Sequence, residues 1–263
     1  MPIGIRRLLK SVLPVRTQKA LLDLQRFYLA GKYQMLGRKT TRMETSKARG
    51  RRVREGFFER YCRGIGLDIG YGGDLLAPNC RPWDIEHGDA LHLRPLKDAS
   101  FDFIYSSHTL EHMPDPSLAL KNWWRVLKLG GYLILYIPYR DLYEKKRELP
   151  SRWNPDHKFY FLVDEDDPPV TLGIVPLIRR SLSEAEIIYA RVCREGFTLT
   201  DPDVHSDGEY SIEVVTQKYA QPTAVGTKKI REDLRGPGRT DTLVADGTEG
   251  RDPALSSDIG ISV

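Results

Sequence analysis

Histidine and carboxylate side chains that could hold a metal ion or move a proton occur together in HTLEH, residues 108–112. The segment matches H-x-x-E-H, a pattern in which two histidines four positions apart bind one zinc ion from a single helix face. Pro114 follows two residues later and is incompatible with a long helix. We therefore expect no metal ion here. Instead we expect Glu111 and His112 to form local hydrogen bonds and His108 to face a substrate.

A further histidine lies in SRWNPDHKFYF, residues 151–161, a segment that mixes aromatic and charged residues. Asp156 could orient His157 as a general base, although neighbouring side chains often point apart. Three aromatic side chains of the same segment could shape an acceptor pocket: Trp153, Phe159 and Tyr160. A purely structural aromatic loop is the alternative interpretation.

Five glycines occupy the first ten residues of GIGLDIGYGGDLLAPN, residues 64–79. A glycine turn after a buried strand lets the backbone approach a ligand, because no Cβ intervenes. Gly70 and Gly72 fit the start of the dinucleotide fingerprint G-x-G-x-x-G, but Leu75 takes the place of its third glycine. A nicotinamide dehydrogenase is therefore disfavoured. A structural turn and a ligand-binding turn both stay open.

The elements that must position these residues follow the order of an α/β fold with a mostly parallel sheet. Asp68 and Asp84 each end a predicted strand, where carboxylates can accept hydrogen bonds from ribose hydroxyls. Asp115 is expected to cap the helix that follows the third strand. The predicted strands and helix are 64–70, 81–86, 100–108, 115–128 (the helix) and 132–138.

Beyond residue 138 the pattern is less regular. Residues 139–180 show no clean period and indicate an inserted loop or lid over the carboxyl edge of the sheet. A helix is predicted at 181–196, and two strands at 197–202 and 210–219. We expect three parts: a basic helical extension (1–54), the main domain (55–219) and a disordered tail (220–263).

Charge is distributed unevenly along the chain. Residues 1–63 carry a net charge of +13, and the remaining residues sum to −9. The basic segment could contact an anionic membrane surface or the chain's own acidic body; few aromatics accompany it, so nucleic acid is disfavoured. The three cysteines form no metal-binding pair, and no apolar run is long enough to span a bilayer. We expect a cytoplasmic protein, with peripheral contact to the inner face of a membrane as an open alternative.

Four segments in order resemble the class I S-adenosylmethionine (SAM)-dependent methyltransferases, in particular the type-11 small-molecule group: LDIGYGG, GDALHL, SFDFIYSSHTLEHMPDP and RVLKLGGYL. The resemblance spans residues 64–138 and extends weakly to residue 219. It implies a Rossmann-like sheet of seven strands whose last two form an antiparallel hairpin. It also implies that SAM is the cofactor and assigns the residues around it. Asp68, Gly70 and Gly72 would line the methionine moiety, Asp84 the ribose, Asp89 and Ala90 the adenine, and Ser106 or Ser107 would close the site.

Two departures from the family pattern concern spacing. Asp74 stands where the family's third glycine is usual, and only eleven residues separate Gly72 from Asp84. The first two helices between the strands are therefore expected to be trimmed, and Glu86 is an alternative to Asp84.

The resemblance implies methyl transfer from SAM to a small-molecule or sugar or glycolipid acceptor. The family's N-P-P-Y signature for amino acceptors is absent, which favours oxygen as the methylated atom. His157 is the first candidate for the general base and His108 the second. The alternative function is a noncatalytic SAM- or nucleotide-binding module that acts through partner contacts.

Overall fold

The computed structural model describes residue 17 and residues 43–198, 206 and 208–219. Most of the predicted basic extension and the whole predicted tail, 220–263, lie outside the described residues. Membrane contact and cytoplasmic location therefore stay predictions. None of the helices in the described ranges is long and apolar enough to cross a membrane.

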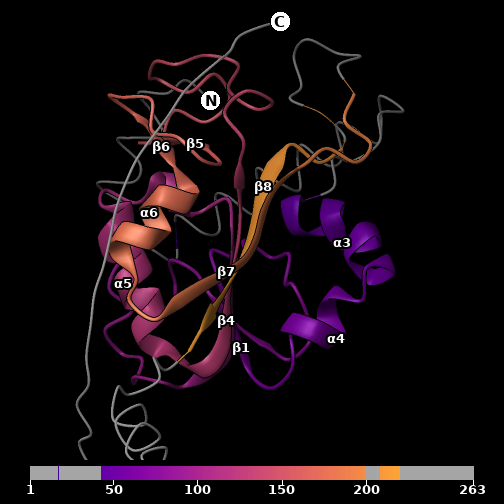
Figure 1. The fold of residues 1–263 in the computed structure, drawn as a ribbon, viewed down its shortest axis with the longest axis vertical. Coiled ribbons are helices and arrows are strands. Elements are labelled where there is room, and N and C mark those ends of the chain that lie inside the picture. Colours follow the sequence, from indigo (N-terminus) through magenta and orange to yellow (C-terminus); the bar gives the residue numbers. More distant parts are fainter. Residues whose placement is uncertain (1–16, 18–42, 199–205, 207, 220–263) are drawn as a thin grey trace, which may run out of the picture. The chain divides into compact units, whose positions relative to one another are not determined.

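A six-stranded sheet in the order β2-β1-β3-β4-β8-β7 organises the described part of the chain (Figure 1). β1 to β4 run parallel, β8 pairs antiparallel with β4, and β7 pairs antiparallel with β8. This confirms the predicted mostly parallel sheet with a C-terminal antiparallel pair, but the described residues form six strands of that sheet, not the seven that the resemblance implied. The strands are Gly66–Ile69 (β1), Cys80–Trp83 (β2), Phe101–Ser107 (β3), Leu127–Pro138 (β4), Ala185–Cys193 (β7) and Ser211–Lys218 (β8).

The connections between the first three strands are short, as the spacing predicted. Residues 70–79 link β1 to β2 through turns, and residues 84–100 link β2 to β3; neither of these described segments contains a helix. A 3-10 turn, η1 (Leu110–His112), follows β3. The HTLEH segment therefore lies where a strand turns into a helix.

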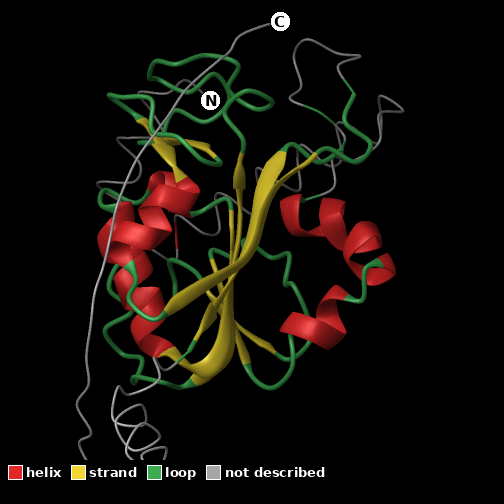
Figure 2. Cartoon of the chain, in the orientation of Figure 1, coloured by secondary structure: helices red, strands yellow, loops and turns green. Residues whose placement is uncertain are grey.

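Helices cover both faces of the sheet (Figure 2). α5 (Pro116–Val126) and α6 (Ile174–Ser181) lie on one face, and α3 (Glu44–Arg54) and α4 (Phe57–Tyr61) on the other. Asp115 caps α5 as predicted, because its Oδ1 accepts a hydrogen bond from the Leu118 N–H at 2.9 Å.

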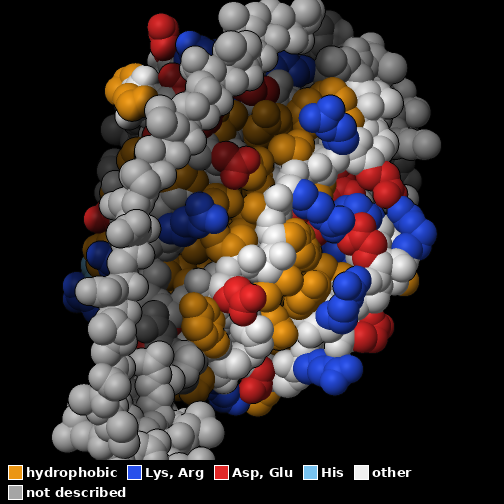
Figure 3. Space-filling view, in the orientation of Figure 1, with side chains coloured by type: hydrophobic (Ala, Val, Ile, Leu, Met, Phe, Trp, Pro, Cys, Tyr) orange, Lys and Arg blue, Asp and Glu red, His pale blue; other side chains and the backbone are white. Residues whose placement is uncertain are grey.

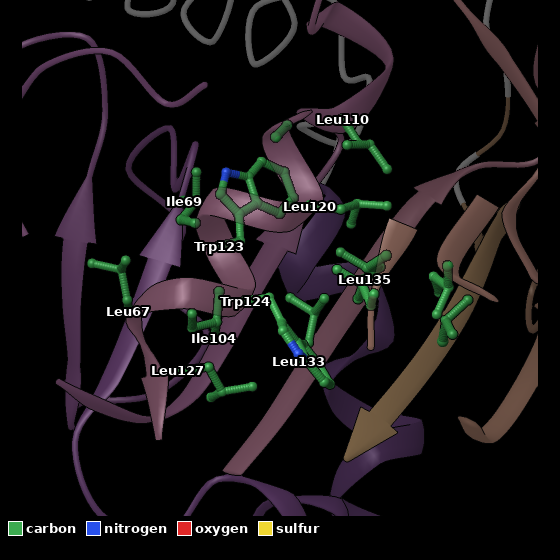
Figure 4. Close-up of a cluster of buried hydrophobic side chains, with 14 of the residues drawn as sticks. Leu67, Ile69, Ile104, Leu110, Leu120, Trp123, Trp124, Leu127, Leu133 and Leu135 are labelled. Atoms are coloured by element: carbon green, nitrogen blue, oxygen red, sulfur yellow. The ribbon is translucent and has the colours of Figure 1, made fainter. Parts of the chain in front are cut away.

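The core on the α5 side explains why that helix forms where it does. Leu120, Trp123 and Trp124 are buried against side chains of β1, β3 and β4 (Figure 4). Their spacing gives the helix one apolar face, and burying each large apolar side chain contributes about 1.5–3 kcal/mol.

The prediction of a helix over residues 181–196 was wrong. Residues 185–193 form β7, which pairs with β8 along its length. The first strand of the predicted hairpin, 197–202, was misplaced for the same reason: β7 takes its place beside β8, residues 197 and 198 are not in a strand, and residues 199–202 lie outside the described residues. Helix propensity in this segment is overridden by the long-range pairing, which aligns Ile187, Tyr189 and Val192 with β8.

The segment predicted as an irregular lid, 139–180, contains regular elements. β5 (Tyr160–Leu162) and β6 (Thr171–Gly173) form a separate two-stranded parallel sheet, and α6 follows directly. Pro176 obscured α6 in the sequence, but it is the third residue of the helix. A first-turn N–H has no partner inside its helix, so proline is tolerated there.

The described end of the basic extension packs against acidic residues of the chain itself. The Arg51 Nη2 lies 2.7 Å from Glu209 Oε2, and the Arg52 Nε lies 2.7 Å from Glu213 Oε2. Burial opposes ionisation of Glu213, but Arg52 and Arg51 together lower its pKa to about 2. Acidic and basic side chains also intermingle at the surface over α3 and α4 (Figure 3). α3 is thus held on the β8 side of the sheet by ion pairs.

Candidate functional site

The glycine turn after β1 is built in a conformation that favours glycine. Gly70, Gly72 and Gly73 have φ values of 74°, 57° and 92°. The Gly70 N–H donates to the Trp83 carbonyl at 2.7 Å, and the Gly72 N–H donates to Asp84 Oδ2 at 3.1 Å. The predicted cofactor residues Gly70, Gly72 and Asp84 therefore lie together.

Open space borders this turn. A Cβ added at Gly73 would meet no atom within 4 Å, whereas one added at Gly70 would collide with Thr109 Oγ1. The glycine at 70 is needed for close packing against the segment after β3. The glycine at 73 faces a place where a ligand can approach the backbone.

Asp68 lies behind the turn and is fully buried in β1. Its Oδ2 accepts a hydrogen bond from the Leu76 N–H at 2.8 Å, while Oδ1 has no hydrogen-bond partner among the described residues. Burial raises the pKa of this carboxyl to about 7. Asp68 thus closes the glycine loop and keeps one acceptor unused.

Asp74, which stands where the resemblance leads one to expect a third glycine, joins the loop to α3. Its carboxylate accepts hydrogen bonds from the backbone N–H and the hydroxyl of Ser46. The N-terminal turn of α3 therefore lies beside the glycine loop. No sequence signal pointed to Ser46, because the contact spans 28 positions.

The residues assigned to adenine lie in the loop after β2. Asp89 accepts from the Leu91 N–H at 2.9 Å and pairs with His92, and its side chain is 58% exposed. The Ala90 carbonyl accepts from the indole N–H of Trp123 at 2.8 Å, which fixes this loop on α5. Asp89 is thus accessible to a ligand at a fixed place.

Ser106 is placed differently from the other predicted cofactor residues. It is 1% exposed, and its hydroxyl donates to the Ile69 carbonyl at 3.1 Å. In this structure it joins β3 to β1.

A cluster of histidines and carboxylates forms beyond β3 and β4. Nδ1 of His157 lies 2.7 Å from Oε1 of Glu144, and Nε2 lies 3.7 Å from Oε1 of Glu111. Glu144 therefore takes the orienting place that the sequence assigned to Asp156. Nothing in the sequence singled out Glu144, which lies in the charged run EKKRE.

Glu111 is at the centre of this cluster. Its side chain is fully buried, and neither carboxylate oxygen hydrogen-bonds another described residue. Burial raises its pKa to about 7, against the attraction of His157. The carboxylate of Glu111 thus has only its own backbone N–H as a local hydrogen-bond donor among the described residues.

His108 reaches the same cluster from the end of β3. Its Nδ1 lies 3.9 Å from Oε1 of Glu111, and its Nε2 lies 2.8 Å from the Ser211 hydroxyl. The rings of Tyr136, Tyr143 and Tyr210 lie within about 6 Å of the His108 ring. Both candidate bases, His108 and His157, therefore approach one buried carboxylate.

The glycine turn and the cluster of histidines and carboxylates both follow the carboxyl ends of parallel strands. This is the edge of the sheet at which α/β folds bind ligands. A hollow at the opposite edge, where β3 and β4 begin, is lined by Arg60, Asp102, Lys128 and neighbouring residues. None of the predicted site residues lines that hollow, so it is not part of the candidate site.

Part of this chain is similar in sequence to known methyltransferases. Residues 51–135 match the family described as methyltransferase domain, type 11. A probable S-adenosylmethionine-dependent methyltransferase of Mycolicibacterium smegmatis is 30% identical, over 35% of this chain and 42% of the relative. A demethylmenaquinone methyltransferase of Staphylococcus haemolyticus is 46% identical over 18% of this chain and 20% of the relative. The chain thus spans less than half the length of these curated relatives.

Solved structures are also similar. A SAM-dependent methyltransferase of Thermotoga maritima aligns with a TM-score of 0.45 and 21% identity, covering 76% of this chain and 97% of that one. One from Archaeoglobus fulgidus aligns with a TM-score of 0.42 and 17% identity, covering 73% and 99%.

Proposed function

We propose that this chain, whose residues 51–135 match a methyltransferase domain, transfers the methyl group of SAM to an oxygen atom of a small-molecule or sugar acceptor. The observation that carries the proposal is the contact of Asp84 with the glycine turn. It puts a carboxylate that could accept hydrogen bonds from a ribose beside a stretch of backbone that is open to a ligand. SAM carries its methyl group on a positively charged sulfur, and that sulfur is a good leaving group.

The described residues fit this cofactor. The turn at Gly72 and Gly73 would lie against the methionine moiety, and Asp84 would accept hydrogen bonds from the ribose. Asp89, exposed in its loop, would face the adenine, with Ala90 fixed beside it by Trp123. The unused Oδ1 of Asp68 is a buried acceptor directly behind the same turn.

A hydroxyl acceptor must lose its proton, and the cluster beyond β3 and β4 offers two bases. Because the Glu144 carboxylate accepts at Nδ1 of His157, the proton lies on Nδ1 and the lone pair of the neutral ring lies on Nε2. His157 is the first candidate, since a carboxylate fixes its ring. His108 is the second, since it lies at the end of β3 near the same carboxylate. General base catalysis contributes about 10²–10⁴-fold to a rate.

One observation favours a noncatalytic binding module as a second function. Asp74 joins α3 to the glycine loop through Ser46, so a bound ligand could stabilise α3 against the sheet and expose or hide a partner surface. In that case SAM would bind and no methyl group would be transferred.

Calorimetry with SAM and S-adenosylhomocysteine tests cofactor binding. The intact chain should bind both, and Gly72→Asp and Asp84→Ala should lose binding. Asp98→Ala is the matched control, since Asp98 is an exposed carboxylate paired with Arg125 away from the turn. Absence of binding by the intact chain, or equal loss in Asp98→Ala, would contradict the proposed cofactor site.

A further inference from the structure

We infer that Glu111, His112 and His157 form a binding site for a divalent transition-metal ion of the zinc class. One ligand atom of each residue lies within 4.8 Å of the other two. The sequence argument excluded a metal because His108 and His112 could not share one long helix. The structure replaces that geometry with another, in which the third ligand comes from the segment after β4.

Glu111 is the observation that points most directly to a ligand. It is a fully buried carboxylate that accepts no hydrogen bond from another described residue. Burying a carboxylate without such partners is energetically costly. A cation held at this point would give the Glu111 carboxylate a charged partner at Oε1. No other described side chain supplies a positive charge within ion-pair distance of Glu111, apart from the histidines around it.

The separations suit a small ion. Nε2 of His157 lies 3.7 Å from Oε1 of Glu111, and Nε2 of His112 lies 3.9 Å from the same oxygen. Zinc bonds of about 2.0–2.1 Å in tetrahedral geometry put neighbouring ligand atoms about 3.3–3.4 Å apart. The two distances to Glu111 therefore need to contract by about half an ångström, and the two imidazole nitrogens, which lie within 4.8 Å of each other, must also move closer together to bind the ion.

The two imidazoles are also held as metal-binding histidines are. The Glu144 carboxylate accepts a hydrogen bond from Nδ1 of His157 at 2.7 Å, which leaves Nε2 for the ion. Carboxylates in this position orient metal-binding histidines and increase their basicity. The His112 ring hydrogen-bonds the backbone of Asp156 and meets the His157 ring edge-on at 4.8 Å. Its contact with Asn154 Nδ2, at 3.5 Å, is long and easily given up.

Two imidazole nitrogens and one carboxylate suit Zn²⁺ and similar ions better than Mg²⁺ or Ca²⁺, which prefer all-oxygen sites. Three protein ligands leave one coordination position open. The site does not depend on the proposed methyl transfer. An ion on Nε2 of His157 would, however, leave His108 as the available base.

The test is a titration of the full-length, chelator-treated protein with Zn²⁺ alone, followed by calorimetry, and with Co²⁺, followed by its visible absorption bands. We expect one ion per chain. Glu111→Gln, which keeps the shape of the side chain, and His112→Ala, at a partly exposed position, should each weaken binding by about 100-fold or more. Glu144→Gln should weaken binding about 10–100-fold. Mg²⁺ should not compete.

His92→Ala is the control, because His92 pairs with Asp89 in a different loop and should leave Zn²⁺ binding unchanged. Circular dichroism and SAM binding report whether each variant is folded, so loss of metal binding is separated from failure of the cofactor site. The inference is overturned if the intact chain binds no Zn²⁺ at micromolar concentration. It is also overturned if folded Glu111→Gln and His112→Ala bind as the intact chain does.

Discussion

Nδ1 of His157 lies 2.7 Å from Oε1 of Glu144, a residue thirteen positions earlier in the chain. Both side chains are almost completely buried. The contact fixes the plane of the imidazole ring and sets which nitrogen carries the lone pair. The proposed role of His157 as a general base depends on this contact.

Replacing either partner should lower turnover without removing the cofactor. We expect His157→Ala to reduce methyl transfer by about 10²–10⁴-fold, with SAM affinity unchanged. Glu144→Gln should lower transfer by a smaller factor, because the ring stays but loses its charged partner.

Asp156→Asn is the matched control for this pair, since the structure gives the orienting place to Glu144. Turnover and calorimetric SAM binding measured side by side separate the roles. If Asp156→Asn impaired transfer while Glu144→Gln did not, the assignment of Glu144 would be wrong. Unchanged turnover in His157→Ala would leave His108 as the base.

The ion pairs that hold α3 should make the stability of the protein depend on pH at the acidic end. The folded-state pKa of Glu213 is about 2, below its ordinary value of 4.5. Its contribution to the free energy of unfolding is therefore present above pH 4.5 and is lost as the pH falls from 4.5 towards 2. Urea unfolding at a series of pH values measures this slope.

Glu213→Gln should remove that part of the slope and destabilise the protein at pH 7 by about 3–5 kcal/mol, because Arg52 stays buried without its charged partner. Glu195→Gln is the comparison. Its pair with Arg54 is more than half exposed and should contribute at most about 1 kcal/mol. Equal effects of the two substitutions would contradict the importance of the buried network.

Asp68 should act in the opposite direction. Its pKa of about 7 in the folded state exceeds the ordinary value of 3.8, so folding favours the protonated form. The group then costs free energy increasingly as the pH rises from about 4 to 7, by up to about 1.4 kcal/mol for each pH unit. Asp68→Asn should therefore gain stability relative to the native chain across this range and show a constant difference above it. A difference that does not vary with pH would contradict the raised pKa.

A matched pair of glycines separates backbone strain from ligand contact. Gly73 and Gly130 have φ values of 92° and 80°, and a Cβ added at either would meet no atom within 4 Å. Alanine should destabilise the protein by a similar amount at both positions, about 1–2 kcal/mol. Only Gly73→Ala should weaken SAM binding, which calorimetry measures. Equal affinities in the two variants would place the cofactor elsewhere.

Local patterns account for the parts of the fold that could be predicted. β1, β3, β4 and α5 are marked by apolar runs or by an apolar helix face with a cap at Asp115. β7 could not be identified from its own residues, because its conformation depends on pairing with β8. α6 was hidden by Pro176, whose position in the first turn is known only once the helix start is known.

The candidate site divides in the same way. The glycine turn and Asp84 were predictable, because each follows a strand that the sequence marks. Their contact with each other, and that of Asp74 with Ser46, required the fold. Glu144 carried no signal at all, since a glutamate in a charged run is ordinarily exposed to solvent. The H-x-x-E-H segment was noticed for a geometry that it does not have.

Transfer of a labelled methyl group tests the central claim most directly. The full chain is incubated with SAM carrying a radiolabelled methyl group and a small-molecule extract, and the products are separated and identified by mass spectrometry. We predict label in a small-molecule or sugar product as an O-methyl group, and none with Asp84→Ala. If the chain binds SAM but no label leaves the cofactor with any extract, the protein is a binding module and the proposed methyl transfer is contradicted.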